Sequence, residues 1–294
     1  MGPVIVVAVI AGGAWLIQQQ GDDFERAVRE LSLGRVLVSG LLAIVGTMLI
    51  ERIWFSLLHG LGARPGSRDA AAVFFVSQLG KYLPGSVWPV VAQMQFGLRW
   101  GVARTVMLAA NVLLLAMVTG SGIVLGGLLL PWSSDEGLRR YWWLVLLLVP
   151  ILIGLHPRTV PALIDWLFRK MGREPLGVTL SGSGVLRSAG WALLAWLVLG
   201  LHIVVLLGAH TQIGVAELAA ATGGFALAWA AGIAFLPAPA GAGVREAIVV
   251  LTLAPFVGTP EALAVALASR VLLLLADVLL AAAGALGRRL ISAA

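Results

Sequence analysis

Residues 78–89, Gln-Leu-Gly-Lys-Tyr-Leu-Pro-Gly-Ser-Val-Trp-Pro, place a lysine, two prolines and two glycines inside a strongly apolar part of the sequence. The apolar run before this stretch begins near Ala70 and the run after it ends near Leu98. Each is shorter than the roughly 20 residues that a membrane-spanning helix needs. Proline removes a backbone donor and glycine lets the chain reverse, which predicts two half-helices that meet at a break. Broken backbone at membrane depth survives only where protein or a wet cavity covers it, so the break is a candidate site.

The composition is that of a polytopic membrane protein. Hydrophobic residues make up 60% of the 294 residues, charged residues make up 12%, and the mean hydropathy is +0.99. In such a protein, a net charge of +6 indicates cytoplasmic loops and lipid headgroups as partners, and not nucleic acid. The absence of cysteine excludes disulfides, thiolate metal sites and cysteine nucleophiles. We expect no metal and no cofactor.

We expect an all-α fold with a single transmembrane domain over residues 1–294, made of six full spans and two re-entrant or broken helical hairpins. The predicted spans are Pro3–Ile17, Arg35–Leu58, Val102–Leu130, Tyr141–Leu155, Leu186–His210 and Ala262–Leu286. The interrupted segments are Ala70–Leu98 and Glu217–Phe256. Pro161–Met171 is expected to form an amphipathic surface helix.

The distribution of arginine and lysine predicts the orientation. The segment His156–Arg187 is rich in basic residues, which places it in the cytoplasm by the positive-inside rule. Further arginines flank the first interrupted segment and follow the last span, and they fall on the same side if each interrupted segment enters and leaves by one face. We therefore expect a multi-pass protein of a bacterial or archaeal plasma membrane with both termini in the cytoplasm.

Matches between the two halves of the chain predict an internal repeat, with chance similarity between leucine-rich spans as the alternative. Leu83-Pro84 matches Leu236-Pro237 at an offset of 153 residues, and Gln93 matches Glu246 at the same offset. Each half then consists of a span, an interrupted segment and a span, over residues 35–130 and 186–289, joined by residues 141–185. Three crossings separate the copies, which predicts inverted repeats. Interrupted segments at matching places in two halves are typical of a transporter's binding site.

Two motifs indicate a family. Residues 80–85, Gly-Lys-Tyr-Leu-Pro-Gly, and residues 236–246, Leu-Pro-Ala-Pro-Ala-Gly-Ala-Gly-Val-Arg-Glu, resemble the lysylphosphatidylglycerol synthase transmembrane family of flippase-like membrane proteins. The resemblance covers about Arg35 to Arg289. It departs from the family pattern at Ala240, where glycine is usual, and it lacks the soluble aminoacyltransferase domain. It implies lipid handling without lipid aminoacylation, and it does not identify the cargo.

Lys81 lies at the first break, and Ser86 is placed to cap the half-helix that follows. A helix N-terminus beside an ammonium group favours an anion such as a lipid phosphate. The alternative for Lys81 is a side chain that extends to the cytoplasmic headgroups. Gln78, Gln93 and Asn111 are candidates for binding headgroup hydroxyls, or for joining helices through hydrogen bonds.

Four charged residues belong to the second half of the candidate site. Arg245 and Glu246 begin the returning half-helix, and Arg270 and Asp277 lie on one face of the last span. An unpaired charge at the bilayer centre costs very roughly 2.5–3.5 kcal/mol, so these residues need partners. We expect Arg245 to pair with Asp277 or a phosphate, and Glu246 to pair with Arg270. A purely structural ion network is the alternative.

Proton or ion coupling is assigned to Glu246 and Asp277, and to Glu51 and His202, which occupy matching places in the two halves. For Glu51 the alternative is a buried carboxylate that is hydrogen-bonded to a helix neighbour.

No catalytic motif is present, so we expect no enzymatic activity. The function predicted from the sequence is the movement between leaflets of an anionic amphipathic lipid, either a phospholipid or a polyprenyl-phosphate carrier. Three alternatives stay open. The chain could be an ion-coupled transporter of a small solute, an enzyme on lipid-linked sugars with Glu246 or Asp277 as base, or a partner subunit for a separate synthase or glycosyltransferase.

Overall fold

The computed structural model describes residues 21–83, 87–154, 156, 159–170, 172, 179–235 and 239–292. These residues form α-helices joined by short turns and 3-10 helices, with no strand among them. The α-helices are α2 (Gly21–Glu30), α3 (Leu33–Gly60), α4 (Ser67–Gln78), α5 (Trp88–Gly97), α6 (Arg104–Leu129), α7 (Asp135–Gly154), α8 (Thr159–Lys170), α9 (Gly182–Leu207), α10 (Val215–Ala234), α11 (Val244–Val257) and α12 (Thr259–Ser292). The 3-10 helices are η1 (Leu79–Tyr82), η2 (Leu98–Trp100), η3 (Leu130–Trp132) and η4 (Pro239–Gly241).

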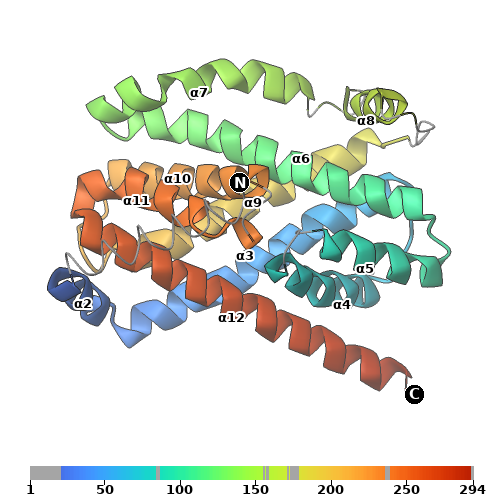
Figure 1. Ribbon diagram of the computed structural model, residues 1–294, viewed down its shortest axis with the longest axis horizontal. Coiled ribbons are helices and arrows are strands. Elements are labelled where there is room, and N and C mark those ends of the chain that lie inside the picture. The colour runs from blue at the N-terminus through green and yellow to red at the C-terminus, as the bar shows by residue number, and fades with distance from the viewer. Residues whose placement is uncertain are drawn as a thin grey trace.

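The long helices run along the long axis of the molecule, and the two interrupted segments enter it from opposite ends (Figure 1). Helices α4 and α5 lie in the half at the right of the view, and α10 and α11 lie in the half at the left. The two breaks meet near the middle, where η1 contacts η4. Helix α12 runs past both segments and contacts α4, η1 and α11.

Within the described residues, five helices are long and apolar enough to cross a membrane, namely α3, α6, α9, α10 and α12. Four of them match predicted spans. The fifth, α10, is the first arm of the second interrupted segment, because residues 215–234 contain no proline and continue for 20 residues. The predicted span Tyr141–Leu155 corresponds to α7, which begins earlier, at Asp135, and is not among the five. The predicted span Pro3–Ile17 lies outside the described residues.

Small residues allow the helices of the core to approach closely. A Cβ atom on Gly122 of α6 would lie 2.7 Å from the carbonyl oxygen of Ala226 on α10, and one on Gly200 of α9 would lie 2.4 Å from Oγ1 of Thr222. Close backbone approach at small residues is how helices associate in lipid, where the hydrophobic effect between helices is absent. Serine N-caps at Ser32 and Ser181 fix the starts of α3 and α9.

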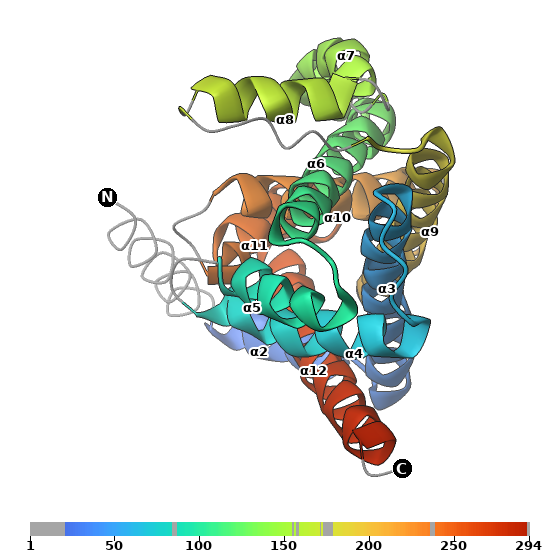
Figure 2. The ribbon, with the colours of Figure 1, turned by 90° about the vertical axis from the view of Figure 1, so that its right-hand side faces the viewer.

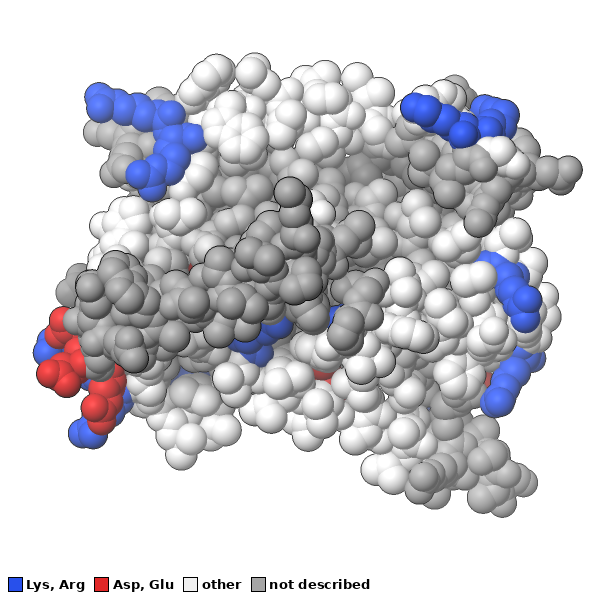
Figure 3. Space-filling model, viewed as in Figure 1, with Lys and Arg blue, Asp and Glu red and all other residues white. Residues whose placement is uncertain are grey.

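On the face shown in Figure 3, most of the visible lysine, arginine and acidic side chains lie toward the two ends of the long axis, and a few lie near the middle. Helix α7 packs on α6 at the edge of the bundle, and α8 lies beside it, as the view turned by 90° also shows (Figure 2). Helix α8 confirms the helix predicted at 161–171, and Nζ of Lys170 lies 5.2 Å from the centre of the exposed Trp166 ring. The five apolar helices are those of a multi-pass membrane protein.

Candidate binding site between the two interrupted segments

The first break follows directly from its sequence. Helix α4 ends at Gln78, η1 tightens the chain over the next four residues, and α5 begins at Trp88. Leu83 is extended, with φ −83° and ψ 148°, as expected for a residue before proline. Gly80 is required for close packing, because a Cβ atom there would lie 2.8 Å from Cβ of Trp88. Ser86, predicted to cap α5, lies outside the described residues, as does Pro84.

The tip of the first segment is attached to α12 through Asp277. Nζ of Lys81 lies 2.7 Å from Oδ2 of Asp277, and the Tyr82 hydroxyl donates a hydrogen bond of 2.6 Å to the same oxygen. The Asp277 side chain is only 4% exposed, while that of Lys81 is 22% exposed. The carboxylate therefore accepts from two donors of η1. The Lys81 side chain stays partly exposed.

The second break is built from residues with positive φ. Ala240, Gly241 and Gly243 have φ of 51°, 68° and 84°, a left-handed conformation that glycine adopts without strain and alanine does not. These residues reverse the chain between α10 and α11. Oε2 of Glu246 then accepts a 2.5 Å hydrogen bond from the backbone N–H of Gly243 and so caps the first turn of α11.

The tip of the second segment is also attached to α12. Nη1 of Arg270 lies 3.0 Å from Oε1 of Glu246 and donates a 3.2 Å hydrogen bond to the carbonyl oxygen of Ala240. The predicted pairing of Glu246 with Arg270 is thus confirmed as an ion pair. The same arginine also holds the strained turn, so that α12 fixes both the carboxylate and the backbone of the second break.

The predicted pairing of Arg245 with Asp277 is wrong, since Asp277 is held by Lys81 and Tyr82. Adjacent helical residues point about 100° apart, and Glu246 faces α12, so Arg245 faces α10 instead. Its guanidinium carbon lies 3.9 Å from the ring centre of Trp229 and 5.7 Å from that of Phe225. Its Nη2 atom is buried and has no hydrogen-bond partner among the described residues.

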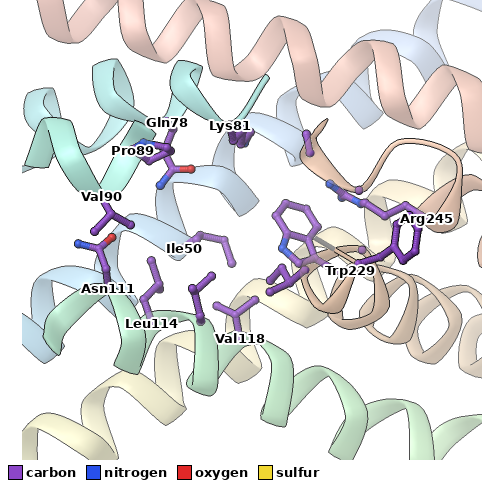
Figure 4. A pocket seen from close by; sticks show the side chains of 16 residues that line it. Ile50, Gln78, Lys81, Pro89, Val90, Asn111, Leu114, Val118, Trp229 and Arg245 are labelled. Atoms are coloured by element: carbon purple, nitrogen blue, oxygen red, sulfur yellow. The ribbon is translucent and has the colours of Figure 1, made fainter. Parts of the chain in front are cut away.

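A cavity of about 190 Å³ lies between the two segments. Lys81 enters it from the first break and Arg245 from the second, and Gln78 and Asn111 add two amides (Figure 4). The remaining wall is largely apolar. It is formed by Ile50, Pro89, Val90, Leu114, Leu115, Val118, Trp229, Gly232, Ile233, Phe235, Ala240 and Gly241. The cavity therefore combines two cationic side chains with a largely apolar wall contributed by α3, α5, α6 and α10.

The other predicted site residues that the structure describes do not line this cavity. Gln93 is buried and its amide donates a 2.8 Å hydrogen bond to Oγ of Ser77, which joins α5 to α4. Glu246, Arg270 and Asp277 lie behind the lining residues and hold the two breaks. Tyr82 and Trp229 were missed by the sequence interpretation. The signals for them were the position of Tyr82 next to Lys81, and the spacing of Phe225 and Trp229 by one helical turn on α10.

Glu51 and His202 are buried in the bundle and are not among the residues that line the cavity. Oε2 of Glu51 lies 2.7 Å from Nε of Arg52, its neighbour in the chain. Nδ1 of His202 lies 2.7 Å from Oγ of Ser39, and Nε2 lies 2.8 Å from Oγ of Ser269, so the imidazole joins α9 to α3 and α12. His202 thus joins three helices, whereas Glu51 contacts a neighbour on its own helix. The assignment of both residues to proton coupling stays a prediction.

The fold and the cavity define a class, that of polytopic helical membrane proteins with interrupted helices that meet at a cation-lined cavity. The chain matches the family model of the lysylphosphatidylglycerol synthase TM region over residues 4–281, and it belongs to that family. The match confirms the resemblance seen in the two motifs at the breaks. No curated protein matches the chain.

Proposed function

We propose that this protein moves an anionic amphipathic lipid between the leaflets of its membrane. One observation carries the proposal: the cavity between the breaks is lined by two cationic side chains, Lys81 and Arg245, and by a wall that is otherwise largely apolar. A lipid presents the same combination, a negatively charged phosphate joined to hydrocarbon. Membership of a family defined on the membrane region of a lipid-modifying synthase agrees with a lipid as the ligand.

The two cations would act on the phosphate in different ways. Arg245 has a buried guanidinium nitrogen without a hydrogen-bond partner among the described residues, and a planar guanidinium matches the geometry of two phosphate oxygens. Lys81 is already bound to Asp277, and an ammonium group with three donors can hold a carboxylate and a phosphate together. The aromatic face of Trp229 fixes the plane of Arg245, so the guanidinium is positioned before the lipid enters.

We further infer that residues 35–130 and 186–289 are inverted repeats that exchange access to the cavity between the two sides. In support, each comprises a long helix, an interrupted segment and a long helix, and the two segments enter from opposite ends (Figure 1). In transporters of this kind, one repeat moves against the other around a central site. The movement would be passive or coupled to an ion.

We infer that the end of the molecule bearing α8 and the C-terminus of α12 faces the cytoplasm of a bacterial or archaeal cell. Arg64, Arg68, Arg99 and Arg104 flank the first interrupted segment, and Arg169 and Lys170 end α8 at the same end of the molecule. The positive-inside rule supports this orientation. Single cysteines that replace exposed Arg68 or exposed Arg26 of α2, in the otherwise cysteine-free chain, test this orientation by labelling. The membrane-impermeant reagent should reach position 26 in intact cells and position 68 only after lysis.

Leaflet exchange in reconstituted vesicles tests the transport proposal. A phospholipid with a fluorescent tail is placed in both leaflets, and a membrane-impermeant reductant quenches the outer one. Vesicles with protein should lose nearly all fluorescence, while protein-free vesicles should lose about half. Arg245→Gln should slow the exchange about tenfold, as expected for one charge-assisted hydrogen bond, whereas Arg187→Gln, an exposed arginine outside the cavity, should not. Fluorescence loss equal to that of protein-free vesicles would contradict the proposal.

A second candidate function is that of a membrane partner for a separate lipid-modifying enzyme, such as a synthase or glycosyltransferase. The family description favours it, because the family is defined on the membrane region of a synthase. Helix α8, which lies beside α7 at the edge of the bundle, offers a docking element (Figure 2). Co-purification of a defined enzyme that is lost when exposed Trp166 and Lys170 are replaced by alanine would support this function.

A further inference from the structure

A second cavity, of about 400 Å³, lies where α3 ends and α9 begins. The two helices pack side by side (Figure 2). They approach closely at two glycines, because a Cβ atom on Gly184 would lie 2.7 Å from Cα of Gly60. The backbone N–H of Ser181 also donates a 3.0 Å hydrogen bond to the carbonyl oxygen of Gly60. Backbone contacts therefore fix the two walls of this cavity to each other.

The lining of this second cavity, called here the polar cavity, comes from the end of α3, the turn after it, and the beginning of α9 with the residues before it. It consists of His59, Gly60, Leu61, Gly62, Arg64, Thr179, Leu180, Ser181, Ser183 and Arg187. Three of these residues are basic and three carry hydroxyl groups, and the described lining contains no carboxylate. The cavity between the interrupted segments has a largely apolar wall instead. The polar cavity is thus suited to an anion with polar substituents, and its volume is that of a small-molecule site.

The two arginines reach the polar cavity from different segments, and neither has an ion pair with a described residue. Arg64 lies in the turn between α3 and α4. Nε of Arg187 donates a 3.3 Å hydrogen bond to the carbonyl oxygen of Ser183, a contact that positions the guanidinium without neutralising it. Two formal positive charges therefore meet at one cavity. A phosphate monoester carries nearly two negative charges at pH 7, and a planar guanidinium matches two of its oxygens.

Arginines near a membrane surface are often there only to contact lipid headgroups. Arg68 provides the comparison, since it is exposed, has no ion pair with a described residue and does not line the polar cavity. Arg64 and Arg187 are also exposed, but they share one cavity with three hydroxyl-bearing residues. This convergence distinguishes the polar cavity from the rest of the basic surface.

His59 supplies an acceptor to the same cavity. Its Nδ1 atom lies 3.1 Å from the carbonyl oxygen of Phe55, and the two rings lie 4.2 Å apart. A carbonyl oxygen only accepts, so Nδ1 is the donor, and Nε2 is the acceptor in the neutral imidazole. Nε2 has no hydrogen-bond partner among the described residues. A hydroxyl group of a ligand can donate to it.

We infer that the polar cavity is a second binding site, which takes a phosphate monoester with a hydroxylated substituent such as a sugar or another polyol. The two arginines hold the phosphate, while His59 and the serine and threonine hydroxyls hold the substituent. A soluble phosphate ester and the headgroup of a phosphomonoester lipid present the same group. The polar cavity shares no lining residue with the cavity between the interrupted segments, so binding here does not depend on the proposed function.

Equilibrium dialysis with radiolabelled glycerol 3-phosphate tests the soluble source, with the protein in detergent micelles free of phosphomonoester lipid. Binding should saturate, and inorganic phosphate should displace the probe while glycerol does not. Arg64→Gln and Arg187→Gln should each weaken binding about tenfold, as expected for one charge-assisted hydrogen bond. Arg68→Gln is the matched control and should bind as the wild type does. An equal loss in all three variants would show a non-specific charge effect and overturn the site.

Retention of phosphatidate, weighed against phosphatidylcholine by native mass spectrometry, tests the lipid source. Arg245→Gln serves as the background, which removes the guanidinium of the other cavity. Retention that is lost when Arg64→Gln or Arg187→Gln is added would assign the site to a lipid headgroup. Dialysis binding without such retention would assign it to a soluble ester. If these two variants weakened the binding of neither probe, the second site would be overturned.

The role of the hydroxylated substituent has its own test in His59→Phe, which keeps a ring beside Phe55 but removes the acceptor. Binding of glycerol 3-phosphate should fall about fivefold, as expected for one neutral hydrogen bond, and binding of inorganic phosphate should not change. A merely structural role of His59 would weaken both probes equally, and that result would overturn the assignment of the substituent.

The two cavities can be separated by a pair of variants. Arg187→Gln should lose phosphate-ester binding and keep leaflet exchange, whereas Arg245→Gln should slow leaflet exchange and keep the binding of glycerol 3-phosphate. Intact binding without any leaflet exchange in the wild type would contradict the proposed function alone. Loss of glycerol 3-phosphate binding in Arg245→Gln, but not in Arg187→Gln, would place the ligand in the other cavity and overturn the second site.

Discussion

The two interrupted segments reach the same cavity and are anchored to the same helix, yet they are anchored differently. The first has short arms, of 12 and 10 residues, and its tip is held at a single carboxylate oxygen, Oδ2 of Asp277. The second has arms of 20 and 14 residues, and Arg270 holds both its carboxylate and its turn. The first segment can therefore be released by breaking contacts at one atom, whereas the second is fixed at two places. We infer that the first tip is the one that moves when the cavity opens.

Breaking the anchor of the second segment should have the largest effect. Glu246→Gln removes the negative charge that faces Arg270, and losing one partner of a partly buried ion pair costs about 3–5 kcal/mol. We expect a clear loss of stability in equilibrium unfolding in mixed micelles, and a loss of leaflet exchange with it.

The double variant Glu246→Gln, Arg270→Gln provides the control for this prediction. Two amides can still hydrogen-bond, and neither leaves a charge behind, so the double variant should recover part of the stability lost in the single variant. The single variant Arg270→Gln completes a double-mutant cycle. If the losses of the two single variants added up to that of the double variant, the interaction between Glu246 and Arg270 would contribute nothing to stability.

Breaking the anchor of the first segment should cost less. Lys81→Gln removes the ammonium group from Asp277, but the Tyr82 hydroxyl stays on the same oxygen. We expect a loss of about 1–3 kcal/mol in the same unfolding assay. Mass spectrometry of the co-purifying lipids should show less bound anionic lipid than with the wild type, because Lys81 lines the cavity. A loss of stability as large as that of Glu246→Gln would remove the proposed difference between the two anchors.

The first anchor can be weakened without a change in charge. Tyr82→Phe deletes only the 2.6 Å hydrogen bond to Asp277, and one hydrogen bond contributes about 1 kcal/mol. If the first tip moves during transport, this variant should open the cavity more often. Access of a cysteine-directed reagent to Gln78→Cys in the otherwise cysteine-free chain should then rise. Tyr141→Phe on α7, which packs on α6 outside the cavity, serves as the matched control. Unchanged access would contradict the movement of the first tip.

The sequence revealed where the chain breaks but not which way each charge faces. Proline and glycine act locally, so the breaks near residues 80 and 240 could be predicted, as could the pairing of Glu246 with Arg270. The partner of Asp277 depends on how α12 is rotated against both segments at once. That rotation is set by packing between helices far apart in the sequence. As a result, Asp277 forms its ion pair with Lys81. The stacking of Arg245 on Trp229 was missed for the same reason.

The smallest expected effect concerns the turn of the second segment, where Ala240 has φ of 51° and ψ of 28°. A left-handed conformation costs a non-glycine residue about 1–2 kcal/mol. Glycine avoids this strain, but its greater backbone freedom in the unfolded chain lowers the free energy of unfolding by about 0.4–1 kcal/mol. The first term is larger, so Ala240→Gly should stabilise the protein by about 0.5–1 kcal/mol. Ala242→Gly is the matched control. Ala242 lies in the same turn without positive φ, so this change carries only the entropic cost and should destabilise. If both variants lost stability equally, glycine would not relieve strain at Ala240. The contact of Arg270 with the carbonyl oxygen of Ala240 would then be what holds the second turn in its conformation.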